Sequence, residues 1–119
     1  MSFRVIHRFS LLALLLLLLS SSSITATTYI VSERSDDYSI QNAINLAKEG
    51  DRIIVKSGIY PERLNITKKI ILLGVDTGEG LPVIDANERR SATTLFVDGI
   101  WLEGFSIVNS GSSWQDAGI

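Results

Sequence analysis

The chain has 119 residues, with 11 Lys and Arg against 13 Asp and Glu, for a formal net charge of −2. This balance argues against a nucleic-acid partner, which is bound through a basic surface. The chain has no cysteine and a single histidine, His7. Disulfides are therefore excluded, and copper sites, zinc sites and histidine-dependent hydrolase triads lack the side chains that they normally need.

Residues 1–26 have the three-part layout of a secretory signal peptide. Arg4 and Arg8 give a basic start, a leucine-rich run covers residues 11–19, and serines follow. A membrane-spanning helix needs roughly 20 apolar residues, so the pattern favours cleavage near Thr27, with an uncleaved N-terminal anchor as the alternative. Cleavage predicts a secreted, periplasmic or cell-surface protein that is not attached to the membrane. It would also remove the only histidine and the only methionine.

Residues 27–50 are predicted to form a short strand and one amphipathic helix. Residues 29–31 favour a strand, and a helix is predicted over residues 38–49. Its apolar face has the i, i+3, i+4, i+7 spacing in Ile40, Ala43, Ile44 and Ala47. Either Asp37 or Ser39 suits the N-cap, and Gly50 suits the left-handed position after the helix end.

Beyond Gly50 the sequence changes to short runs of Ile, Val, Leu and Phe between Gly, Asn and Asp. The predicted strands are residues 53–55, 64–66, 70–73, 83–84, 95–97, 100–102 and 105–108. No helix pattern lies between them, which excludes a doubly wound α/β sheet. An antiparallel sandwich and a solenoid remain.

The turns favour the solenoid. A sandwich needs a hairpin signal at each reversal, and Asp98-Gly99 is the one such pair. Strands are instead followed by glycine corners, at Gly58, Gly74, Gly99 and Gly104. These corners mark a degenerate repeat of roughly 20 residues, with a longer excursion at residues 76–81.

Several segments resemble the N-terminal portion of pectin-lyase-like right-handed parallel β-helix proteins. They are residues 39–44, 50–55, 58–62, 69–74, 83–85 and 104–110. Within that superfamily the chain is most similar to the NosD-like copper-binding branch and to carbohydrate-binding and sugar-hydrolase repeat domains. The resemblance covers residue 38 to the end.

The resemblance implies an all-β solenoid, a right-handed parallel β-helix with an N-terminal capping α-helix. Residues 27–50 would form the first strand and the capping helix, and residues 51–119 about three coils. We expect the solenoid to be truncated and incomplete, because the sequence stops in what the family pattern suggests is the middle of a coil.

The charged residues favour structural roles, so no catalytic residue, metal site or cofactor is assigned. Asp76, Glu79 and Asp85 could supply oxygen ligands to calcium, but their spacing matches no EF-hand loop. Asp98 and Glu103 could be imagined as a general acid and base, but a turn aspartate and an outward glutamate are simpler interpretations. Glu62 is interpreted as structural, and Arg89-Arg90 as an exposed turn.

The candidate carbohydrate-binding residues are Trp101 and Trp114, whose indoles could stack on sugar rings. Trp101 alternates with Ile100 and Leu102, which predicts that it faces outward. Asn65-Ile66-Thr67 is an N-glycosylation sequon, and Asn65 is predicted to face solvent.

The leading hypothesis is a secreted or cell-surface β-helix domain that binds or displays ligands, with a polysaccharide or cell-surface glycan as partner and no catalysis by these residues. One alternative is the N-terminal fragment of a polysaccharide lyase or pectin esterase whose active site lies on missing coils. Another is a NosD-like copper accessory protein, which the shortage of His, Met and Cys weakens.

Overall fold

The computed structural model describes residues 23–36, 38–88 and 91–111. Most of the predicted signal peptide, and also Asp37, Arg89, Arg90 and Trp114, lie outside the described residues. The elements, in chain order, are β1 (Thr28–Val31), α2 (Ile40–Leu46), β2 (Arg52–Lys56), β3 (Ile59–Tyr60), β4 (Leu64–Ile66), β5 (Ile71–Val75), β6 (Val83–Asp85), β7 (Thr93–Leu95), β8 (Trp101–Glu103) and β9 (Ser106–Val108). Within the described ranges no helix has the length and apolar content to cross a membrane.

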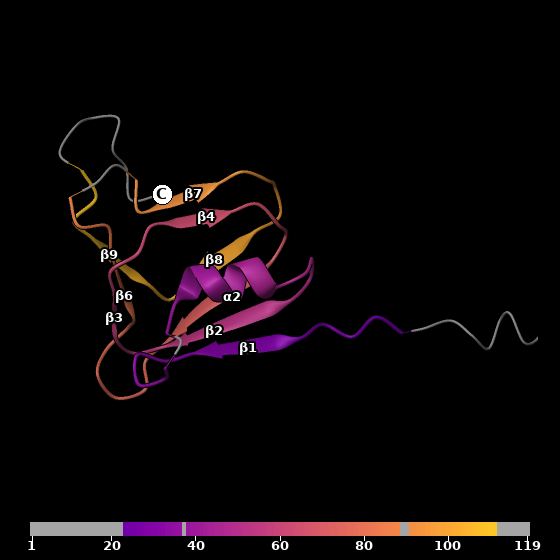
Figure 1. Ribbon diagram of the computed structural model, residues 1–119, viewed down its shortest axis with the longest axis horizontal. Helices are drawn as coiled ribbons and strands as arrows, with labels where there is room; N and C mark the ends of the chain where they lie inside the picture. Colours follow the sequence, from indigo (N-terminus) through magenta and orange to yellow (C-terminus); the bar gives the residue numbers. More distant parts are fainter. Residues whose placement is uncertain (1–22, 37, 89–90, 112–119) are drawn as a thin grey trace, which may run out of the picture.

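The strands of the described residues form three sheets, in which every strand pair is parallel. The sheet orders are β1-β2-β5-β8, β3-β6-β9 and β4-β7. From β2 onward the chain enters these sheets in a fixed rotation, so each strand pairs with the strand that follows it by one circuit (Figure 1). The registers are continuous: Thr28 pairs with Arg52, Arg52 with Ile71, and Ile71 with Trp101. The expectation of an all-β class with one short helix is confirmed.

The core lies between the three sheets, because side chains alternate along each strand between the interior and solvent. In β2, Ile53 and Val55 are fully buried whereas Arg52 and Lys56 are exposed. Buried side chains from the other sheets, such as Leu64 and Ile84, complete the same cluster. Burying a side chain of this size stabilises the fold by about 1.5–3 kcal/mol relative to leaving it exposed.

The helix is shorter than predicted, at both ends. Ser39 is the N-cap, and its hydroxyl accepts from the Asn42 amide at 3.1 Å. The helix ends at Leu46 because Ala47 has an extended backbone, although its methyl group is buried in the core as the pattern required. Gly50 does have a positive φ of 85°, but in the turn that leads into β2 rather than directly after the helix.

Asp51 fixes this turn. It is only 5% exposed, and its two carboxylate oxygens accept from the amides of Lys48 and Thr27, both at 2.8 Å. The hydrogen bond from the Lys48 amide has the larger effect and that from Thr27 the next, and together they hold the pKa of Asp51 below its usual value. The carboxylate therefore joins the end of the helical segment to the residue before β1.

Helix α2 packs beside β1, β2 and β4, and lies in front of the sheets in Figure 1. Side chains of the first circuit satisfy both of its ends. Glu62 accepts from the amides of Ile40 at 2.7 Å and Gln41 at 3.1 Å, and from the Ser39 hydroxyl at 2.6 Å. Lys68 donates to the carbonyls at the opposite end, those of Ile44, Asn45 and Ala47. The structural interpretation of Glu62 is thus supported by its contacts.

The helix also covers one edge of β4. The side-chain amide of Gln41 donates to the Asn65 carbonyl at 3.2 Å and accepts from the Asn65 amide at 2.9 Å. Gln41 therefore bonds to β4 in the manner of a neighbouring strand, while β7 pairs with the other side of β4. An unpaired strand edge invites pairing with other chains, so this contact supports the capping role predicted for the helix.

Two local predictions were wrong, and one strand was missed. Gly74 is not a corner: it lies inside β5, facing Gly104, and a Cβ there would collide with the Gly104 carbonyl. Strand β3 was not predicted, because two residues are too short for a visible alternation. Strand β7 begins at Thr93 rather than at Leu95, because Ala92 and Thr93 are the residues buried there.

Candidate functional site

The four-stranded sheet has an apolar side toward solvent, called here the outer face. It consists of the outward residues of the sheet: Thr28, Ile30, Arg52, Ile54, Lys56, Ile71, Leu73, Val75, Trp101 and Glu103. Six of these are large and hydrophobic. By contrast, the outward pair on β4 and β7 is Asn65 with Thr94, both polar. The outer face is therefore more apolar than the outward side of the β4-β7 sheet. The outward side of β3-β6-β9 is mixed, with Ile59, Val83 and Val108 beside Asp85 and Ser106.

Trp101 lies at the β8 border of the outer face, and its side chain is 59% exposed. The prediction that it points outward is confirmed. Ile71 is its register partner on β5, and Arg52 is the partner of Ile71 on β2. An exposed indole beside an aliphatic residue offers a flat apolar platform, and a pyranose ring can stack on such a platform through its C–H face.

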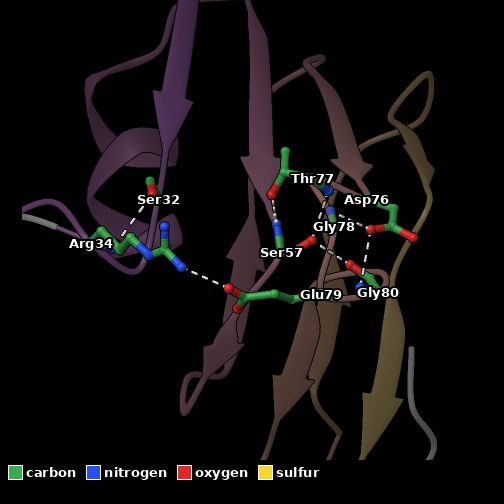
Figure 2. Close-up of polar contacts among 8 residues, drawn as sticks. All are labelled: Ser32, Arg34, Ser57, Asp76, Thr77, Gly78, Glu79 and Gly80. Atoms are coloured by element: carbon green, nitrogen blue, oxygen red, sulfur yellow. Dashed lines mark hydrogen bonds and ion pairs between the residues drawn. The ribbon is translucent and has the colours of Figure 1, made fainter.

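A separate polar cavity of about 230 Å³ lies between the segment after β1, the end of β2 and the loop after β5. Figure 2 shows the contacts that build it. The amide of Ser57 donates to the Thr77 hydroxyl at 3.3 Å, and the amide of Thr77 donates to the Ser57 hydroxyl at 2.8 Å. The Ser57 hydroxyl in turn donates to the Gly80 carbonyl. These bonds hold the loop after β5 against the end of β2, and the cavity is also lined by the charged residues Glu33, Arg34, Lys56 and Glu79.

The candidate calcium ligands do not converge. Asp76 accepts from the amides of Gly78 at 2.8 Å and Gly80 at 3.0 Å, which lower its pKa (Figure 2). Glu79 forms an ion pair with Arg34 at 2.7 Å, and both side chains are largely exposed.

Asp85 is the last residue of β6, where it accepts from the Asn87 amide at 2.8 Å and the Asn109 side chain at 3.0 Å. Among the described residues no three acidic, histidine or cysteine side chains are grouped so that they could hold a metal ion.

Asp98 and Glu103 also lie in different surroundings. Asp98 is exposed in the turn between β7 and β8, which belong to different sheets, so Asp98-Gly99 forms no hairpin. Glu103 is exposed on the outer face. Asn65 is exposed on β4, as the sequon interpretation required, and its backbone is bonded to Gln41.

The sequence did not reveal two buried polar features. Asp51 follows the glycine of a turn, which is a usable signal for a carboxylate that accepts backbone amides. Thr93 gave no such signal, because threonine is common in strands. Its hydroxyl is fully buried without a hydrogen-bond partner.

Comparison of this chain with protein-family models, with curated proteins and with solved structures finds no match.

Proposed function

We propose that this chain forms the first coils of a right-handed parallel β-helix, exported to the periplasm, cell surface or medium, that binds carbohydrate without catalysing a reaction. The three parallel sheets, entered in rotation and continuous in register, support the solenoid. Right-handedness is the general rule for connections between parallel strands. The resemblance of residues 38–119 to pectin-lyase-like proteins points to the same fold.

The observation that carries carbohydrate binding is the exposed indole of Trp101 on the outer face. Aromatic residues contribute much of the contact area in binding sites and suffer a low entropy cost, because they have two rotatable bonds. Ile71 extends the platform, and Arg52 offers a hydrogen-bond donor at its far side. The glycan would lie across the strands, with one ring on the indole.

The test is binding of the purified protein to a panel of soluble and insoluble polysaccharides. Trp101→Ala should weaken binding about tenfold, which corresponds to about 1.4 kcal/mol. Phe96→Ala is the matched control, because Phe96 is 63% exposed but lies between β7 and β8, away from the outer face. Equal binding by the wild type and Trp101→Ala would overturn the proposal. Release of unsaturated uronides or methanol from pectic substrates would show that the chain is an enzyme.

A further inference from the structure

The outer face has the composition of a contact surface rather than of a solvated sheet. A contiguous exposed apolar patch commonly marks an interaction site. Here Ile54, Ile71 and Leu73 lie on adjacent strands, and Ile30 and Trp101 extend the patch to the two border strands, with 63% and 59% exposure.

We propose that a second copy of this chain packs on the outer face, about a twofold axis that runs parallel to the strands between β2 and β5. Stacked sheets lie about 10 Å apart with nearly aligned strands. This axis places β2 of one copy over β5 of the other and keeps each residue at its own height along the strand. Because Ile54 and Leu73 are register partners, Ile54 of one copy then lies over Leu73 of the other.

The charges of the outer face select this axis. The cations Arg52 and Lys56 are on β2, and the anion Glu103 is on β8. The axis carries β8 of one copy over β1 of the other, next to β2, so Glu103 comes within reach of the opposite Arg52 and Lys56. A twofold axis perpendicular to the strands would instead place β2 over β2, with Arg52 over Lys56, and like charges would repel.

The size of the face predicts weak association. Four strands about 4.8 Å apart, with three to five residues each, span on the order of 300 Å² in projection, whereas stable interfaces bury about 800 Å² on each partner. The dimer should therefore form at high micromolar concentrations. The aliphatic centre and the charges of the outer face carry this inference. The dimer would cover Trp101, Ile71 and Arg52, so it competes with the proposed glycan for this face.

The test uses two charge-reversed variants of the full chain, studied alone and mixed, by sedimentation at protein concentrations from micromolar to millimolar. The first variant is Arg52→Glu with Lys56→Glu, and the second is Glu103→Lys. Each variant alone has a face of one sign and should associate at least tenfold more weakly than the wild type. The equimolar mixture has opposite faces and should recover association. Circular dichroism checks that both variants fold.

Glu88→Lys is the matched control, because Glu88 is exposed in the turn after β6, a strand of another sheet; it should associate like the wild type. Recovery in the mixture should weaken with added salt, since exposed charges are screened. Any association through residues 1–26 would be equal in the mixture and in each variant alone. A mixture that associates no more strongly than its components, or a wild type that stays monomeric near millimolar concentration, would overturn the proposal.

Discussion

Loss of the Glu62 carboxylate should destabilise the protein more than loss of any other exposed or half-buried acid of comparable size. At the start of α2, the Ser39 oxygens accept from the amides of Asn42 and Ala43, and Glu62 accepts from those of Ile40 and Gln41. The first helical amides have no partner within the helix. The bond from Ala43 to the Ser39 carbonyl is the first intrahelical one, so Glu62 binds two of the three helical amides that precede it.

The magnitude follows from these contacts. Hydrogen bonds to a charged group contribute roughly 1.5–3 kcal/mol when well formed, and loss of a helix cap costs about 1 kcal/mol. Because Glu62 is partly exposed, we expect Glu62→Ala to cost about 2–4 kcal/mol. Glu62→Gln keeps one acceptor oxygen, and should cost about half as much.

Urea unfolding followed by circular dichroism measures this loss. With a slope of about 2 kcal/mol per molar urea, Glu62→Ala should lower the midpoint by about 1–2 M. Hydrogen exchange at the Ile40 and Gln41 amides should accelerate in the same variant. Glu49→Ala, an exposed acid beyond the helix, should change stability by less than about 0.5 kcal/mol. The reasoning fails if Glu62→Ala and Glu49→Ala have the same midpoint.

Three other changes have definite expected outcomes. Thr93→Val should raise the free energy of unfolding by about 1 kcal/mol, because it removes a buried hydroxyl that has no partner; a lower thermal midpoint would contradict this. Gly74→Ala should lower the free energy of unfolding by about 3 kcal/mol, because the new methyl group would collide with the Gly104 backbone. Gly50→Ala has open space around the methyl group but a φ of 85°, so it should lower the free energy of unfolding by about 1–2 kcal/mol. Urea titration of the two variants would measure both losses. The lowered pKa of Asp51 stabilises the fold above its unfolded pKa of about 3.9, and this contribution is lost as the pH falls through the folded pKa. Asp51→Asn should therefore have a flatter stability profile below about pH 4 than the wild type; parallel profiles would exclude the assigned role.

The sequence predicts the strands in which apolar and polar residues visibly alternate, because this alternation depends only on neighbouring residues of the same segment. It predicts the apolar face of α2 for the same reason, but not its end, since the extended backbone of Ala47 depends on the turn held by Asp51. Gly74 could not be understood from its own segment: its need for glycine arises from Gly104, on the next circuit.

In the candidate site, too, some features follow from the local sequence and others depend on contacts between successive circuits. The outward direction of Trp101 follows from its two apolar neighbours in sequence, and it is confirmed by its exposure. Its position in line with Ile71 and Arg52 could not be predicted, because the loops between successive circuits have unequal lengths. The separation of Asp76 from Asp85 could not be predicted for the same reason. Asp76 follows β5, whereas Asp85 ends β6, which belongs to a different sheet.

The contact between Gln41 and Asn65 has a consequence for how a stack of strands can be closed. A strand added to protect an exposed edge has an outer edge of its own, so the problem is only moved outward by one strand. A helix does not transfer the problem, because its backbone groups are bonded within the helix. With its side-chain amide, Gln41 offers one donor and one acceptor in place of a peptide group, so strand pairing in the β4–β7 sheet stops on that side without leaving a new edge to cover.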